Sequence, residues 1–210
     1  MPSTEAVWRF AEEFVVEPPE IDAARRQSIE LGIDAVAPAI GAQLAVIAAA
    51  SSAGNIIEIG TGAGVSGLWL LRGAPEATLT SIDIEPDHQQ HARKAFAEAG
   101  IPANRLRLIA GRARDVLPRM NEASYDIVLV DADAASVIEY VEHGLRLVRK
   151  GGTVLVAHAL WHGKVADPVQ RDGTVAGFRT VLTEVAGSEA VLSALTPLGG
   201  GLLQLAKIAD

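Results

Sequence analysis

The chain has 210 residues, of which 49% are hydrophobic and 21% charged, a balance typical of a globular protein with a substantial core. Its net charge of −8 argues against nucleic acid as a partner, and the lack of cysteine excludes disulfides, thiolate catalysis and cysteine-bound zinc. The N-terminus carries Glu5, Glu12 and Glu13 in place of a basic, apolar leader, and the longest apolar run, residues 44–50, is too short for a membrane span, so we expect a cytoplasmic protein.

Residues 3–52 have a helical pattern, interrupted by Pro18-Pro19 and by Gly32. Strands and helices then alternate, and most of the candidate strands are continuous apolar runs, as expected of parallel strands covered on both faces. The five candidate strands are residues 55–59, 78–83, 105–110, 125–131 and 153–157. Helices are predicted to begin at Val65, to cover residues 86–99, and to follow the apolar face of residues 137–148, with Lys150-Gly151-Gly152 ending the last one.

The tail breaks this alternation. Residues 190–198 and 202–208 are strand-like and are joined by three glycines, which leaves no room for a crossover helix, so they predict a hairpin with an antiparallel strand. The expected fold is α/β, with a mostly parallel seven-stranded sheet, a C-terminal antiparallel hairpin and helices on both faces. We expect one domain over residues 1–210, made of a helical cap (1–52) and an α/β core (53–210).

The most informative segment is residues 56–67, IIEIGTGAGVSG, in which a buried strand runs into a glycine-rich turn and a helix. Glycines 60, 62 and 64 allow positive φ and a close approach to a ligand, and the first helix amides can meet negative charge. The pattern predicts a nucleotide or nucleoside cofactor. Residues 62–67 also fit the dinucleotide fingerprint, with Asp83 at a plausible ribose distance, but Glu58 would repel a pyrophosphate and suit an ammonium group.

Four segments, residues 57–67, 80–86, 125–133 and 198–203, together with the loop 160–168, carry a family resemblance. The chain resembles the class I S-adenosylmethionine (SAM)-dependent O-methyltransferases related to catechol and caffeoyl-coenzyme A O-methyltransferases, especially the small bacterial members. The resemblance implies a Rossmann-like methyltransferase fold, SAM as cofactor with S-adenosylhomocysteine as product, a small acceptor such as a phenol, and a homodimer. The apolar N-terminal residues Val7, Trp8, Phe10, Phe14 and Val15 are expected either to cover the cofactor site or to pack in that dimer.

Carried over by position, the resemblance implies cofactor-binding roles for Val36, Glu58, Gly60, Thr61, Gly62, Ser66, Asp83, Ile84, Ala113 and Asp131. Glu58 and Gly60 would lie beside the methionine part and Ser66 would bind its carboxylate. Asp83 would accept hydrogen bonds from both ribose hydroxyls, and Ile84 would pack on adenine. We expect Asp83 to act on the ligand alone, so that its removal leaves the glycine loop intact.

The chain departs from the family where that family binds a divalent cation. The family's lysine base is replaced by Ala134, and its Asp-Asn pair after the fifth strand is replaced by Ala157 and His158. Asp131 alone is a poor site for Mg²⁺, which requires several oxygen ligands, so no metal is expected. His158 is the candidate general base, with Asp131 beside it, because an unperturbed imidazole titrates near pH ~6.5. A histidine that merely fills the vacated metal volume is the open alternative.

The leading hypothesis is therefore a metal-independent O-methyltransferase. One alternative is a protein that binds SAM without catalysis and has a regulatory role. Another is a nicotinamide-dependent reductase, which would need a Tyr-x-x-x-Lys pair; the positions four residues after Tyr125 and Tyr140 are Leu129 and Gly144.

Overall fold

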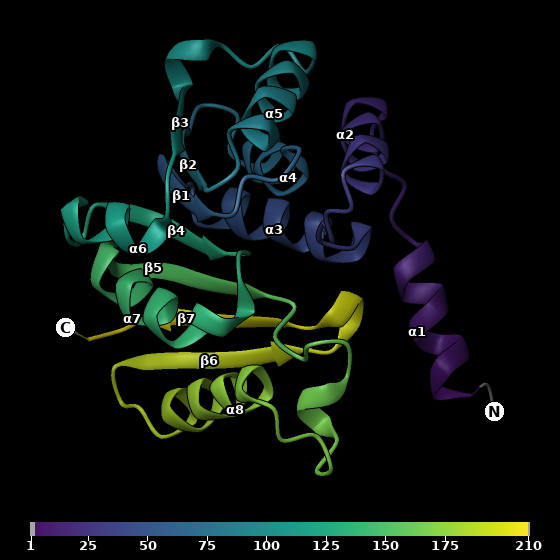
Figure 1. Ribbon diagram of the computed structural model, residues 1–210, viewed down its shortest axis with the longest axis vertical. Helices are drawn as coiled ribbons and strands as arrows, with labels where there is room; N and C mark the ends of the chain where they lie inside the picture. The colour runs from purple at the N-terminus through teal and green to yellow at the C-terminus, as the bar shows by residue number, and fades with distance from the viewer. Residues whose placement is uncertain (1–2, 210) are drawn as a thin grey trace.

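A computed structural model describes residues 3–209 of the chain (Figure 1). Its seven strands form one sheet, in the order β3-β2-β1-β4-β5-β7-β6. The strands are β1 (Asn55–Ile59), β2 (Thr78–Asp83), β3 (Leu106–Ala110), β4 (Tyr125–Val130), β5 (Val148–Ala157), β6 (Val191–Thr196) and β7 (Leu202–Lys207). Strands β1 to β5 are parallel to one another, and β7 is antiparallel to both β5 and β6. The predicted fold, with its C-terminal hairpin, is confirmed.

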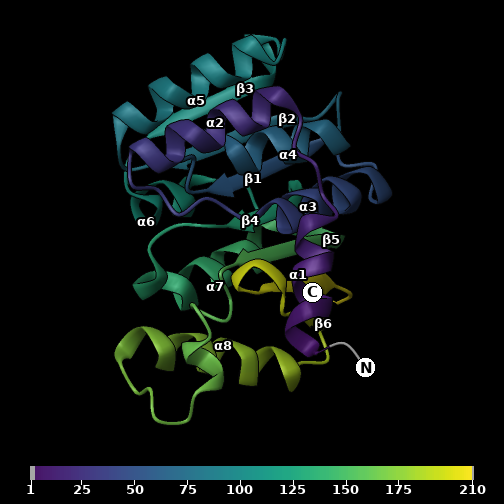
Figure 2. The ribbon, with the colours of Figure 1, turned by 90° about the vertical axis from the view of Figure 1, so that its right-hand side faces the viewer.

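Helices cover both faces of this sheet, as Figures 1 and 2 show. They are α1 (Thr4–Glu13), α2 (Pro19–Glu30), α3 (Pro38–Ala50), α4 (Val65–Gly73), α5 (Pro86–Glu98), α6 (Ala113–Val116), α7 (Val137–Leu147) and α8 (Gly173–Ala186). Alternate strand residues point to opposite faces. Ile56 therefore packs in the cluster formed with α2 to α5, whereas Ile57 packs in the cluster formed with α6 to α8.

Prolines set the start of three helices. Pro19, Pro38 and Pro86 each occupy the first turn of a helix, where the missing N–H costs no intrahelical bond and the fixed φ suits the helix. Two of these helices, α2 and α3, form the N-terminal cap, and the segment between them, residues 31–37, lies over the carboxyl ends of the strands. The cap of residues 1–52 and the core of residues 53–210 remain predicted boundaries; residues 1, 2 and 210 lie outside the described residues.

Helix α1 lies at the margin of the molecule, on the purple side of Figure 1, where it contacts α3 and the short helical turn η5 (Leu198–Gly200). Its Glu12 carboxylate accepts a hydrogen bond from the Gly199 amide at 3.1 Å. Phe10 in α1 and Phe14 just after it are 75% and 79% exposed, so much of the apolar surface here is uncovered. Across residues 3–209, no helix combines the length and the apolar content that crossing a bilayer requires.

The predicted end of α7 and the predicted start of β5 are both wrong, and in both cases the reason is the role of the glycines at 151 and 152. Strand β5 begins at Val148, so Lys150-Gly151-Gly152 lies inside the strand and does not end α7, which stops at Leu147. A Cβ on Gly152 would lie 2.6 Å from the Val148 side chain and 2.7 Å from the Asp126 carbonyl, and the register against β4 shifts at this point. These glycines therefore serve an irregularity within the strand. Helix α8 was not predicted at all.

Candidate functional site

The glycine loop links β1 to α4, and backbone contacts require glycine at two of its positions. Gly60 has a φ of +101°, and a Cβ there would lie 1.9 Å from the Asp131 carbonyl oxygen. Gly64 has a φ of +95° and precedes the first residue of α4. Side chains at these positions would push the loop away from β4 or strain the helix start. The glycines thus bring the loop, α4 and the end of β4 together.

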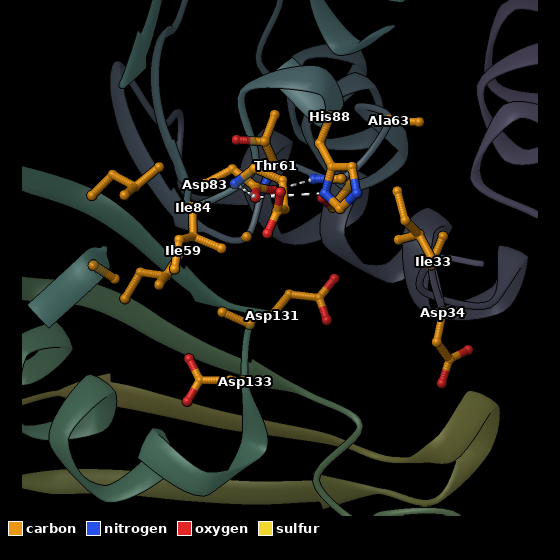
Figure 3. A pocket seen from close by; sticks show the side chains of 18 of the residues that line it. Ile33, Asp34, Ile59, Thr61, Ala63, Asp83, Ile84, His88, Asp131 and Asp133 are labelled. Atoms are coloured by element: carbon orange, nitrogen blue, oxygen red, sulfur yellow. Dashed lines mark hydrogen bonds and ion pairs between the residues drawn. The ribbon is translucent and has the colours of Figure 1, made fainter. Parts of the chain in front are cut away.

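A cavity of about 450 Å³ opens beside this loop (Figure 3). Its walls are the loop, the ends of β1, β2 and β4, the turn before α6, and cap residues 33–36 together with Ser28. Of the residues predicted to bind cofactor, all except Glu58 line it: Val36, Gly60, Thr61, Gly62, Ser66, Asp83, Ile84, Ala113 and Asp131. A volume of this size falls within the range of small-molecule sites, roughly 300–1,000 Å³. The role of each of these residues in binding a cofactor stays a prediction.

Glu58 lies beneath the loop instead of in the cavity wall. Its carboxyl is fully buried and accepts hydrogen bonds from Ser66 (2.9 Å) and Ser81 (2.7 Å), whose hydroxyl also lies 2.6 Å from that of Thr61. Ser81 is the cross-strand partner of Glu58, so the two side chains share one face of the sheet. Burial raises the pKa of Glu58 to about 8. Its contacts support the loop from below, and its predicted place beside the methionine part of the cofactor stays a prediction.

Asp83 binds the glycine loop directly. One carboxylate oxygen accepts from the amides of Thr61 (3.0 Å) and Gly62 (2.9 Å), and the other accepts from Glu85 (2.9 Å). The expectation that the loop is independent of Asp83 is therefore wrong. His88, to which the sequence analysis gave no site role, lines the cavity with its Nδ1 3.5 Å from Asp83 (Figure 3). Its position in the first turn of α5, directly after β2, was the available signal.

The wall across from Asp83 carries Asp131 and Asp133, both labelled in Figure 3. Tyr140 in α7 donates a 2.5 Å hydrogen bond to Asp133, and burial together with this bond raises the pKa of Tyr140 to about 12. Tyr140 and Ser136 also line the cavity. The sequence analysis assigned no site role to Asp133, Ser136 or Tyr140. The apolar face of α7 predicts a helix, but it does not show which polar side chains near the start of that helix point into the cavity.

The predicted pair of catalytic side chains does come together. His158 Nε2 lies 3.4 Å from Asp131 Oδ1, and Nε2 is the buried side-chain polar atom without a hydrogen bond within the described part of the chain. Burial raises the pKa of Asp131 to about 6, with His158 opposing the rise and Asp34 adding to it. Asp34, from the cap, lies 3.8 Å from His158 Nδ1 and 3.7 Å from His162 Nε2.

The turn after β5 is strained. His158, Trp161 and His162 all have φ between +44° and +54°, a region that costs non-glycine residues about 1–3 kcal/mol each and recurs at functional sites. A smaller hollow adjoins the main cavity at Asp131 and is lined by Ala134, Ala157, His158, Trp161 and Phe178 among others. Trp161 stacks on Phe178 with ring centroids 5.9 Å apart.

The donor set at this end does not fit a hard divalent cation. Within residues 3–209, no group of three or more histidine or acidic side chains is placed to hold a metal ion. Ala134 and Ala157 offer no side-chain oxygen in the hollow beside Asp131. The hollow offers the carboxylates of Asp131 and Asp133, the second of which accepts a hydrogen bond from Tyr140, and the imidazole of His158, which fall short of the several oxygen ligands that Mg²⁺ requires.

Comparisons with known proteins agree on one family. The O-methyltransferase family matches residues 20–208. A relative from Mycobacterium sp. (strain KMS), named "Putative O-methyltransferase", is 45% identical over 97% of this chain and 93% of its own. A solved Corynebacterium glutamicum protein is similar with a TM-score of 0.89 at 30% identity, covering 99% of both chains. The O-methyltransferase TomG from Streptomyces achromogenes, solved in complex with SAM, has a TM-score of 0.85 at 29% identity, covering 99% of this chain and 100% of its own.

Proposed function

The chain belongs to the O-methyltransferase family, and on that premise we propose that it is a SAM-dependent enzyme that methylates an oxygen of a small acceptor such as a phenol, without a divalent cation. The observation that carries the proposal is the cavity beside the glycine loop, which has carboxylates at both ends. Asp83 stands at one end and Asp131 with Asp133 at the other. The TomG structure contains SAM in a protein of the same fold.

The charges of the cavity suit a cationic ligand. Five carboxyl side chains line it, against two arginines at the start of α6: Asp34, Asp83, Glu85, Asp131 and Asp133, with Arg112 and Arg114. A pyrophosphate would be repelled by this wall, whereas SAM carries a sulfonium and an ammonium charge. Ile84 is a large apolar side chain left 54% exposed at the cavity wall, as a residue that packs on adenine would be. These features favour SAM over a nicotinamide dinucleotide.

Residues at both ends have chemistry that matches parts of this ligand. Asp83 would accept from the ribose hydroxyls, while its hydrogen bonds with Thr61 and Gly62 keep the loop in place. Asp133, held by Tyr140, is the unassigned acid on the opposite wall, and it replaces Glu58 as the carboxylate suited to the ammonium group. The first amides of α4, which have no side-chain cap, are available to a carboxylate.

At the reacting end, the chain's own groups handle the acceptor proton. When bound, SAM supplies a methyl group made electrophilic by the sulfonium charge. We assign His158 Nε2 as the atom that takes the proton from the acceptor hydroxyl, because this nitrogen is buried, lacks a hydrogen bond and faces Asp131. Asp131 then stabilises the imidazolium that forms. Neither step needs a metal.

We also propose a cytoplasmic homodimer of single-domain subunits. The support for the dimer is α1, whose apolar residues remain exposed at the margin of the subunit. A chain without cysteine needs no oxidising compartment, which suits the cytoplasm.

The test is transfer of a labelled methyl group from SAM to a panel of phenols, with and without chelator. We expect methylation that survives the chelator. Binding of S-adenosylhomocysteine without transfer to any acceptor would favour a non-catalytic SAM-binding protein, and thermal stabilisation by NADH instead would favour a reductase. Activity abolished by chelator and restored by Mg²⁺ would overturn metal independence.

A further inference from the structure

Four groups from separate parts of the chain meet behind the cavity. They are the carboxylate of Glu17 between α1 and α2, the guanidinium of Arg25 in α2, the carbonyl of Val36 before α3, and the indole of Trp69 in α4. Arg25 donates to both Glu17 oxygens (2.5 and 2.8 Å) and to the Val36 carbonyl (2.7 Å), and Trp69 Nε1 donates to Glu17 (3.2 Å). We call this set the cap clasp.

The cap clasp has the properties of a strong polar contact. The side chains of Arg25 and Glu17 are only 18% and 9% exposed, so solvent screens their attraction less than it would a surface pair. The guanidinium and the carboxylate meet through two parallel bonds, the geometry that gives such pairs both strength and direction. Removing either partner would leave the other charge poorly compensated.

The cap clasp acts on the backbone that roofs the cavity. Val36 lines the cavity and is itself 1% exposed, and Arg25 donates a hydrogen bond to its carbonyl oxygen. Three residues earlier, Ile33 lies against the glycine loop, since a Cβ on Gly62 would be 3.3 Å from Ile33 Cγ2. Segment 33–36 is therefore held at one end by Arg25 and rests on the loop at the other.

Trp69 connects this roof to the helix that carries the loop. It belongs to α4, whose N-terminus is the end of the glycine loop. Its ring also packs on α3 so closely that a Cβ on Gly41 would lie 2.2 Å from it. The cap clasp thus connects segment 33–36, the segment before α2 and the helix that follows the glycine loop. Its side chains, those of Arg25, Glu17 and Trp69, do not themselves line the cavity.

We propose that Arg25, oriented by Glu17, is a positioning residue that holds segment 33–36 closed over the cofactor cavity and so slows release of its ligand. The identity of that ligand rests on the proposed function. Among the described residues, no hydrogen bond or ion pair joins the cap clasp directly to His158 or Asp131, although Asp34, in the segment that the cap clasp holds, lies 3.8 Å from His158 Nδ1. Loss of Arg25 should therefore affect retention of SAM more than methyl transfer itself.

The test compares Arg25→Met and Arg25→Lys with Arg26→Met, a matched control on the same helix whose arginine is exposed and pairs with Asp22. Lysine keeps the charge but cannot bridge Glu17 and Val36 as a planar fork does. We expect Arg25→Met to weaken S-adenosylhomocysteine binding about tenfold through a faster dissociation rate, with Arg25→Lys intermediate and Arg26→Met unchanged. The KM for SAM should rise by a larger factor than kcat falls or the acceptor KM changes.

Trp69→Phe and Glu17→Gln keep the proposal testable if Arg25→Met fails to fold, because each removes one contact with little change of shape. A folded Arg25→Met with the wild-type dissociation rate would overturn it, as would an equal loss in Arg26→Met. Hydrogen exchange at residues 33–36 in the ligand-free protein separates this proposal from the proposed function. If the wild type binds no S-adenosylhomocysteine, faster exchange in Arg25→Met than in Arg26→Met still supports the clasp, and equal exchange rejects it.

Discussion

At the scale of single residues, the site uses the same side chain for structure and for ligand binding. The Asp83 carboxylate accepts hydrogen bonds from two loop amides and from Glu85 while its oxygens line the cavity. A carboxylate has about four acceptor positions, so these backbone bonds leave capacity for a ligand hydroxyl. The loop and the ligand therefore depend on Asp83 together, and a substitution there changes both.

Asp83→Ala should lower the free energy of unfolding by about 1–3 kcal/mol, because buried loop amides lose their acceptor. It should also weaken S-adenosylhomocysteine binding. Asp83→Asn keeps one acceptor oxygen, so it should retain more stability while still losing affinity. Chemical denaturation and calorimetry measure the two effects, with the exposed Asp87→Asn as control. An Asp83→Ala protein with unchanged affinity would mean that the cavity binds a different ligand.

His158→Ala should reduce kcat by about 100-fold or more, the lower range for loss of a general base, with little change in S-adenosylhomocysteine affinity. The reason is its position, since His158 faces Asp131 at the acceptor end and not the glycine loop. His162→Ala is the matched control, because this more exposed imidazole contacts Asp34 but neither lines the cavity nor reaches Asp131. Equal activity of the two variants would leave His158 as a residue that only fills space.

At the scale of elements, the parallel strands and the site at their carboxyl ends could be predicted from sequence. Continuous apolar runs marked the strands, and the glycine loop marked the end where ligand groups meet. Helix α8 could not be found this way. Its Gly173 and Gly177 and several β-branched residues disfavour a helix, which forms because Phe178 and its neighbours pack on the sheet. Asp172, which caps it by accepting from Val175, was the one local signal.

The sequence also does not show toward which face of the sheet a buried strand residue points, and this limited the prediction of the site. The run Ile57-Glu58-Ile59 is buried on both sides, so its pattern does not tell which neighbour a polar side chain will meet. The register with β2 decides that Glu58 meets Ser81. Similarly, Asp34 and Val36 reach the site through the path of the cap, which depends on contacts remote in sequence such as Arg25 with Glu17.

The loop itself gives a prediction at this scale. Gly60→Ala should lower the free energy of unfolding by at least about 2 kcal/mol, because the new methyl group would collide with the Asp131 carbonyl and force β1 and β4 apart. Gly100→Ala separates collision from backbone strain, since Gly100 also has positive φ but has open space around it. Denaturant unfolding of both variants is the measurement. Equal losses would show that only the φ matters.

At the scale of the whole molecule, a buried acid makes stability depend on pH. The pKa of Glu58 is about 8 in the folded protein against its ordinary value of 4.5, so between these pH values the folded state keeps a proton that the unfolded state has released. Stability should therefore fall as pH rises from 6 to 8, by up to about 1.4 kcal/mol per pH unit from this group. Glu58→Gln should flatten that slope. Parallel slopes for the two proteins, by urea unfolding across this range, would contradict the assignment.

The last prediction concerns assembly. The exposed apolar residues Val7, Phe10 and Phe14 follow one another at helical spacing along and just beyond α1, and Val16, two residues further on, is 88% exposed. A monomer would leave this surface in water, whereas a second copy of the same helix offers a self-complementary apolar partner. Light scattering at micromolar concentration should give the mass of a dimer. Phe10→Asp with Phe14→Asp should shift it toward the monomer, because charges would be buried at the contact, while the exposed Glu5→Lys should not. A wild-type monomer under these conditions would reject the dimer, and the apolar strip would then require another partner.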